Sequence, residues 1–135
     1  MNETSAPSFD WTHFHGVAAR LLALDGEAAL RSAVSRDYYA VFHAARSILA
    51  DLDPSYRSPI GHESHLSIWH ALAALQYRQS RSAAGLGRSL LSARTTADYH
   101  RQARDWPKLA QSAHEQSRRA LAQLQDLKSK LAAKN

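Results

Sequence analysis

Two side chains of one predicted helix, Arg36 and His43, have types and a spacing that suit phosphodiester chemistry. A helix advances about 100° per residue, so residues seven apart project within about 20° of each other. An imidazole can exchange a proton near neutral pH, and a guanidinium can hold a phosphate. RNA brings its own nucleophile, the 2′-hydroxyl. The pair therefore suits cleavage of RNA without a metal.

The spacing alone proves nothing, because Arg followed by His after four to six residues occurs three times: Arg36 to His43, Arg57 to His62 and Arg94 to His100. The second match crosses a loop that contains Pro59, and the third would place its side chains on largely opposing faces. Only the first match is both helical and co-facial. The structural alternative is a salt bridge for Arg36 and a packing role for His43.

The face that carries Arg36 and His43 is otherwise lined by small side chains. Its members are Arg36, Ala40, His43, Ser47 and Ala50, with Tyr39 and Ala44 at its edges. Small residues let another helix approach closely. Two helical turns separate the pair by about 10 Å, a long reach for one phosphate. A two-fold partner would bring two Arg and two His together. We therefore expect a homodimer built on this face.

The elements that must position this pair are predicted to be helices. The chain has 135 residues with only five Gly and four Pro, a balance that favours helix over strand. Apolar periodicity predicts helices over residues 10–24, 27–52, 64–81, 88–102 and 107–133. Gly85 and Gly87 are expected to separate the third from the fourth. We expect one all-α antiparallel bundle over residues 1–135, with residues 1–9 as a disordered tail. The rival for residues 107–133 is a coiled-coil arm.

Composition excludes several classes of protein. There is no cysteine, which rules out disulfides and thiolate zinc sites. Residues 1–9 lack the apolar core of a signal peptide, and no apolar run reaches the roughly 20 residues that span a bilayer. We expect a soluble, cytoplasmic protein without a membrane partner. Gly85-Leu86-Gly87 lacks a preceding strand and a third glycine, which excludes a nucleotide-binding α/β fold.

The positive charge is concentrated in residues 78–104. The formal net charge is +5, and this segment contains six Arg and a single acid, Asp98. Such a patch favours nucleic acid as a partner, although the same arginines could simply cover solvated faces. The predicted RNA-binding residues are Arg78, Arg81, Arg88, Arg101 and Arg104. Arg94 and Asp98 are four residues apart and are more typical of a structural polar clamp.

A second cluster could suggest a metal site. It contains His62, Glu63, His65 and His70, but His65 and His70 point to different faces of a helix. We expect no metal and no cofactor. For His65 we expect a hydrogen bond to the bundle.

Residues 35–45, Ser-Arg-Asp-Tyr-Tyr-Ala-Val-Phe-His-Ala-Ala, closely resemble the second-helix signature of HEPN domains. Ser64-His65 resembles the Ser/Thr-His that opens the next helix of this family. The segment 94–99 resembles the family's Arg-three-residues-Asp-Tyr element. Together these matches span residues from about 27 to 131, most of the chain.

The resemblance implies a bundle of four long helices plus a shorter one, and a dimer. It also implies a ribonuclease site at the dimer interface formed by Arg36 and His43, with Asp37 as the polar residue that usually follows the Arg. Tyr39 and Ser47 are expected to support it. Many such domains are toxins paired with a minimal nucleotidyltransferase antitoxin. The alternatives are a non-catalytic dimeric module that binds RNA, nucleotide or a nucleotidyltransferase, and a structural helical adaptor.

Overall fold

The computed structural model describes residues 9–56, 63–103 and 105–134, and this part of the chain contains five α-helices and no strand. The helices are α1 (His13–Leu24), α2 (Glu27–Leu52), α3 (Glu63–Ala73), α4 (Arg78–Tyr99) and α5 (Trp106–Ala133). The all-α bundle is thereby confirmed. Residues 1–8 of the expected tail, and most of the expected loop after α2, lie outside the described residues.

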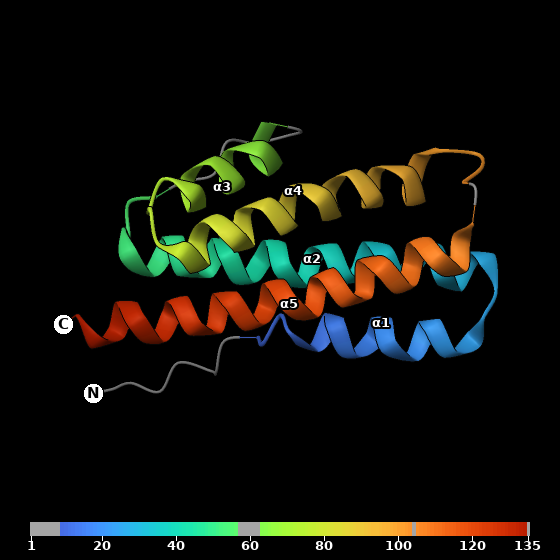
Figure 1. Cartoon of the computed structure of the whole chain (residues 1–135), viewed down its shortest axis with the longest axis horizontal. Coiled ribbons are helices and arrows are strands. Elements are labelled where there is room, and N and C mark those ends of the chain that lie inside the picture. The colour runs from blue at the N-terminus through green and yellow to red at the C-terminus, as the bar shows by residue number, and fades with distance from the viewer. Residues whose placement is uncertain (1–8, 57–62, 104, 135) are drawn as a thin grey trace.

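The long helix α2 is the centre of the bundle and contacts each of the other four helices. It lies beside α5, with α1 on one side of this pair and α4 on the other (Figure 1). The short helix α3 covers α4 on the side away from α1. This arrangement gives α2 two sides: one packs on α1 and α5, the other on α3 and α4.

The predicted boundary between the third and fourth helices is wrong. Both Gly85 and Gly87 lie inside α4, and the chain turns earlier, between α3 and α4, where Gln76 adopts a positive φ of 65°. Gly87 has a packing role instead, because a Cβ atom there would lie 2.5 Å from ring carbons of Trp69. The glycine lets α3 and α4 approach closely, and it does not end a helix.

Arg31 ties α2 to the connection between α4 and α5. Its guanidinium donates hydrogen bonds to the carbonyl oxygens of Ala97, His100 and Arg101 at 3.1, 2.7 and 2.8 Å. Its carbon ζ lies 4.0 Å from the ring centroid of Trp106, the first residue of α5. The carbonyls at a helix C-terminus lack intrahelical partners, so one cation here satisfies two of them and the carbonyl of the next loop residue.

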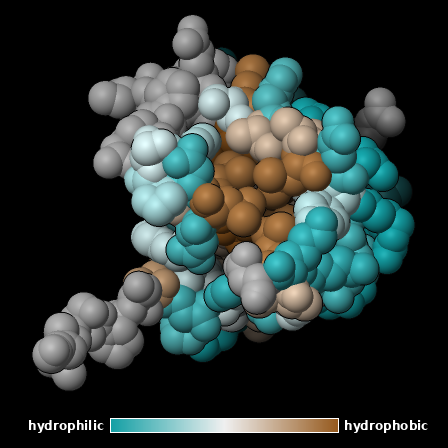
Figure 2. All heavy atoms as spheres, turned by 90° about the vertical axis from the view of Figure 1, so that its left-hand side faces the viewer, coloured by the Kyte–Doolittle hydropathy of each residue, from teal (hydrophilic) through white to brown (hydrophobic). Residues whose placement is uncertain are grey.

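The hydrophobic core runs the length of the bundle. Its largest fully buried side chains include Trp69, Tyr38, Ile68 and Leu72. At the end of the bundle that faces the viewer in Figure 2, hydrophobic side chains reach the surface inside a ring of polar ones. Among the described helices, none has both the length and the apolar character required to cross a membrane.

Candidate functional site

The structure places Arg36 and His43 on one uninterrupted helix, and both contact aromatic residues of the chain segment around the start of α1. Arg36 is exposed, and its carbon ζ lies 5.2 Å from the ring centroid of Phe14. His43 is half-buried and stacks on Trp11, with ring centroids 3.8 Å apart and planes 20° apart. Trp11 and Phe14 themselves pack edge to face, with centroids 5.5 Å apart. The two candidate residues therefore border a single aromatic cluster.

The environment of His43 favours its neutral form. Partial burial lowers the pKa of the imidazole, and electrostatic interactions with Arg46 and His65 lower it further. Tyr39 adds a second ring, with its centroid 5.9 Å from that of His43. An uncharged imidazole can accept a proton at neutral pH.

The predicted partner face of α2 is only partly open. Ala40 is fully buried within the single chain, on a helix that α1 packs against. This corrects the expectation that the whole small-residue face is available to a second copy. Ala44 is half-buried, and Ser47 and Ala50 are exposed. Only this later half of the face can receive another helix.

A groove of about 610 Å³ runs along the open half of this face. Its walls come from the segment before α1, from α2 and from the second half of α5, and include Trp11, Ser47, Ala50, Leu121 and Lys128. Trp11 therefore lines the groove and stacks on His43. Ser47, predicted as a supporting residue, is a wall of this groove.

Of the other two predicted supporting residues, Tyr39 stays beside His43, with ring centroids 5.9 Å apart, whereas Asp37 leaves the Arg36 and His43 face. Tyr39 is half-buried beneath Arg94, whose carbon ζ lies 5.4 Å from its ring centroid. Asp37 is completely buried and turns toward α1 and α5. The carboxylate of Asp37 is therefore not available to the Arg and the His.

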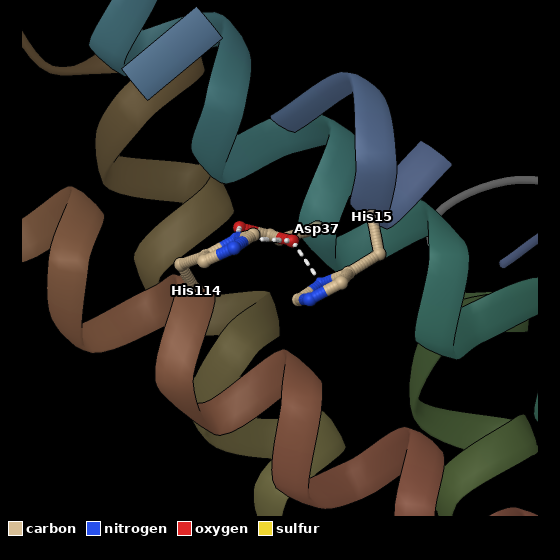
Figure 3. A group of neighbouring side chains, drawn as sticks. All are labelled: His15, Asp37 and His114. Atoms are coloured by element: carbon tan, nitrogen blue, oxygen red, sulfur yellow. Dashed lines mark hydrogen bonds and ion pairs between the residues drawn. The ribbon is translucent and has the colours of Figure 1, made fainter. Parts of the chain in front are cut away.

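Asp37 instead forms a cluster that sequence reasoning missed. The Nδ1 atom of His15 in α1 lies 2.9 Å from one carboxylate oxygen, and the Nδ1 atom of His114 in α5 lies 2.9 Å from the other. The two imidazole rings are parallel within 2°, with centroids 4.1 Å apart, and both turn an edge toward the carboxylate (Figure 3). The hydroxyl of the buried Ser117 lies 3.0 Å from His15 Nδ1.

Only one indication of this cluster was present in the sequence. Ser117 interrupts the buried stripe of α5 formed by Ala110, Ala113, Ala120 and Leu124. A polar residue on such a stripe requires a buried hydrogen-bond partner. Because His15 and His114 are 99 residues apart, no local spacing could have paired them.

The predicted RNA-binding arginines are exposed but lie away from the Arg36 and His43 face. Arg78, Arg81 and Arg88 fall within an arc of roughly 80° on α4, and all three are exposed, as is Arg101 after the helix end. Figure 1 places α4 across the α2 and α5 pair from α1. Arg104 lies outside the described residues.

Two structural roles predicted from the sequence are confirmed. Arg94 pairs with Asp98 at 2.9 Å and lies over the ring of Tyr39 in the neighbouring helix. His65 hydrogen-bonds to the bundle through its Nδ1 atom, 2.7 Å from the hydroxyl of Tyr38. Burial of that tyrosine raises its pKa well above the ordinary value.

The second histidine cluster considered in the sequence is only partly covered by the structure. His62 lies outside the described residues, and His70 is exposed. The one group of potential metal ligands within the described residues is the cluster of His15, Asp37 and His114.

Comparison with known proteins gives no match of any kind: no family model, no curated protein and no solved structure matches this chain. Functional proposals are therefore based on the fold, on the surroundings of His43, and on the cluster of His15, Asp37 and His114.

Proposed function

We propose that this protein is a metal-independent endoribonuclease that acts as a homodimer, with Arg36 and His43 as its catalytic residues. The observation that carries the proposal is the state of His43: its imidazole is half-buried, its pKa is lowered, and it stacks on Trp11, which lines an open groove. Arg36 is exposed on the same face. The resemblance of residues 35–45 to the HEPN signature supports the same assignment, and with it the role of a cytoplasmic toxin with a nucleotidyltransferase antitoxin.

The proposed reaction uses the RNA 2′-hydroxyl as the nucleophile. Neutral His43 removes the hydroxyl proton as the oxygen attacks the adjacent phosphorus, and the P–O bond to the 5′-oxygen breaks. The leaving 5′-oxygen takes a proton from an acid. The products are a 2′,3′-cyclic phosphate and a 5′-hydroxyl. Arg36 holds the phosphate oxygens and stabilises the charge that develops on them.

Two protomers are needed because one protomer supplies a single His on this face. The spacing of Arg36 and His43 along the helix, about 10 Å, is too long for both to contact one phosphate without a partner. A two-fold contact at the open half of the face, around Ala44, Ser47 and Ala50, would bring two copies of the pair together. One His43 would then act as the base and its copy as the acid.

RNA binding is assigned to the outer stripe of α4. The exposed arginines Arg78, Arg81 and Arg88 carry no acid between them on that stripe. They lie on α4, across the α2 and α5 pair from α1 (Figure 1), so we propose that they hold flanking parts of a long RNA. Such contacts release counterions, and affinity should fall steeply as salt rises.

The decisive experiment measures cleavage of RNA by the full chain in EDTA. We expect products that end in a 2′,3′-cyclic phosphate or its hydrolysis product. His43→Ala should lower the rate by about 10²- to 10⁴-fold while sparing most RNA binding, because it removes proton transfer. Arg36→Ala should reduce both rate and affinity. His70→Ala, which changes an exposed histidine of α3, is the matched control and should remain fully active.

Mixing the two inactive variants tests the shared site. A heterodimer of His43→Ala and Arg36→Ala retains one Arg and one His, and partial recovery of activity is expected. Full activity of His43→Ala, or activity only with added metal, would contradict the proposed mechanism.

The second candidate function is a non-catalytic dimeric module that binds RNA, nucleotide or a nucleotidyltransferase. One observation favours it: Arg36 and His43 both lie against rings of their own chain, Phe14 and Trp11. Salt-sensitive RNA binding by the wild-type protein without any cleavage would select this function. A neighbouring gene for a minimal nucleotidyltransferase would support the toxin role or this module over a structural adaptor.

A further inference from the structure

Three helices meet at His15, Asp37 and His114, and each contributes one side chain with a metal-binding atom. The three ligand atoms all lie within 4.8 Å of one another. They come from α1, α2 and α5 and converge on a single point inside the bundle (Figure 3). We propose that this cluster binds one divalent transition-metal ion, of which Zn²⁺ is the best match.

The donor set defines the class of metal. Two imidazole nitrogens and one carboxylate oxygen are the protein ligands of many zinc sites in which water or substrate takes the fourth position. Imidazole donors also suit Co²⁺ and Ni²⁺, whereas Mg²⁺ and Ca²⁺ prefer all-oxygen sites. The site should therefore reject the alkaline-earth ions.

The distances require only a small rearrangement. Ligand atoms about 2.0 Å from a tetrahedral metal are roughly 3.3 Å from one another. The present separations of the imidazole nitrogens from the carboxylate oxygens are 2.9 to 3.1 Å. The parallel rings must also turn so that both lone pairs point at the ion. Side-chain exposures of 23% for His15 and 22% for His114 leave room for that turn.

Metal binding must displace two protons from the ligand atoms. A carboxylate only accepts hydrogen bonds, so each Nδ1 atom that contacts Asp37 now carries a hydrogen. When the ion binds, the proton on Nδ1 leaves to solvent. A neutral ring takes up a proton from solvent on Nε2 instead. An imidazolium would release one proton to solvent.

Charge gives a reason for an ion at this position. Asp37 is fully buried, and its ion-pair partners among the described residues are both histidines, which are cationic only when protonated. A buried carboxylate is costly without a compensating positive charge. A divalent ion would supply that charge at any pH at which the imidazoles are free to bind. Water can fill the fourth position beside the hydroxyl of Ser117.

The site is separate from the proposed ribonuclease pair. His43 stacks on Trp11, whereas His15 stacks on His114. Failure of either proposal therefore leaves the other standing, and metal binding is measured without any assay of RNA cleavage.

The test uses the full chain without a histidine tag, freed of metal with EDTA and then dialysed. Titration with Zn²⁺ should give one ion per chain by calorimetry, and Co²⁺ should give the visible absorption bands of a four-coordinate site. His15→Ala and His114→Ala should each lower the affinity by more than about 100-fold, since loss of even an outer-shell partner costs 10- to 100-fold. Mg²⁺ should not bind.

The matched controls are His13→Ala and His70→Ala, which change exposed histidines of α1 and α3 and should leave the affinity unchanged. If the ligand variants fail to fold, the Co²⁺ spectrum of the wild-type protein still decides the matter. Absence of both the bands and any Zn²⁺ heat would overturn the proposal. So would equal binding by His15→Ala, His114→Ala and the wild-type protein.

Discussion

The two sides of α2 are held to their neighbours by different physical means. Toward α3 and α4, Tyr38 and Phe42 pack edge to face against Trp69, and Gly87 leaves room for that indole. Toward α1 and α5, a buried carboxylate is bonded to two imidazoles. The contact at Trp69 depends on complementary shape, and the contact at Asp37 depends on directional hydrogen bonds.

This difference determines which changes each side tolerates. A close-packed side is sensitive to added volume, because its neighbours have no space into which to move. A polar side is sensitive to the loss of one partner, because the remaining groups are left without hydrogen bonds. The hydrogen bonds of Asp37 also fix the register of α1 and α5 along α2. The following substitutions separate the two cases.

The largest loss of stability is expected for Asp37→Ala. It leaves the Nδ1 donor of His114 without an acceptor and leaves His15 with only the hydroxyl of Ser117, and an unsatisfied donor costs about 1–3 kcal/mol. Because both rings are partly exposed, we expect a total of about 3 kcal/mol in the free energy of unfolding. Urea denaturation in EDTA measures it without any contribution from bound metal.

The control for this variant is Asp51→Ala, which removes an exposed acid of the same helix and should change stability by less than about 0.5 kcal/mol. A loss below about 1 kcal/mol for Asp37→Ala would mean that these hydrogen bonds add little to the packing on the α1 and α5 side.

The second prediction adds volume on the opposite side. The new methyl group of Gly87→Ala would overlap the Trp69 ring, and overpacking of this kind costs about 1–3 kcal/mol. Gly85→Ala is the matched control because nothing lies within 4 Å of its Cβ position. That variant should gain about 0.5–1 kcal/mol from helix propensity. Equal effects of the two substitutions in urea would refute close packing between α3 and α4.

The smallest effect concerns the pH dependence of stability that arises from His43. Burial lowers the pKa of folded His43 below its ordinary value of 6.5, so the unfolded chain takes up this proton first as pH falls. Stability therefore decreases as pH is lowered from about 6.5 toward the folded pKa. His43→Phe keeps the ring against Trp11 and should remove this decrease. Unfolding curves of both proteins between pH 7.5 and 5 measure it, and parallel profiles would argue against a shifted His43.

Helix composition and periodicity were enough to predict the bundle, because α2 and α5 carry long and regular apolar patterns. They failed at the turn between α3 and α4. Glycine is usually a helix breaker, but Gly87 is required by a tryptophan 18 residues earlier. The real turn uses Gln76, a residue type that gives no local indication of a positive φ. Contacts between helices overrode local preference at both positions.

The candidate site was predictable only where its residues share one helix. Arg36 and His43 follow directly from the geometry of α2. The burial of Ala40 within its own chain was not predictable, because small residues suit a helix of the same chain as well as a partner's helix. The bonds of Asp37 depend on the packing of three helices, which no spacing in the sequence records.

The Arg31 contacts have a consequence for how the molecule opens. They join the first turns of α2 to the carbonyls that end α4 and to the indole that begins α5. Segments linked in this way exchange their amide hydrogens as one cooperative unit. The amide of His100, which donates to the carbonyl oxygen of Thr96 at 3.1 Å, should therefore be protected from deuterium exchange as strongly as the amides of early α2. Local opening of the bundle would then begin elsewhere, away from the end of the molecule that Arg31 closes.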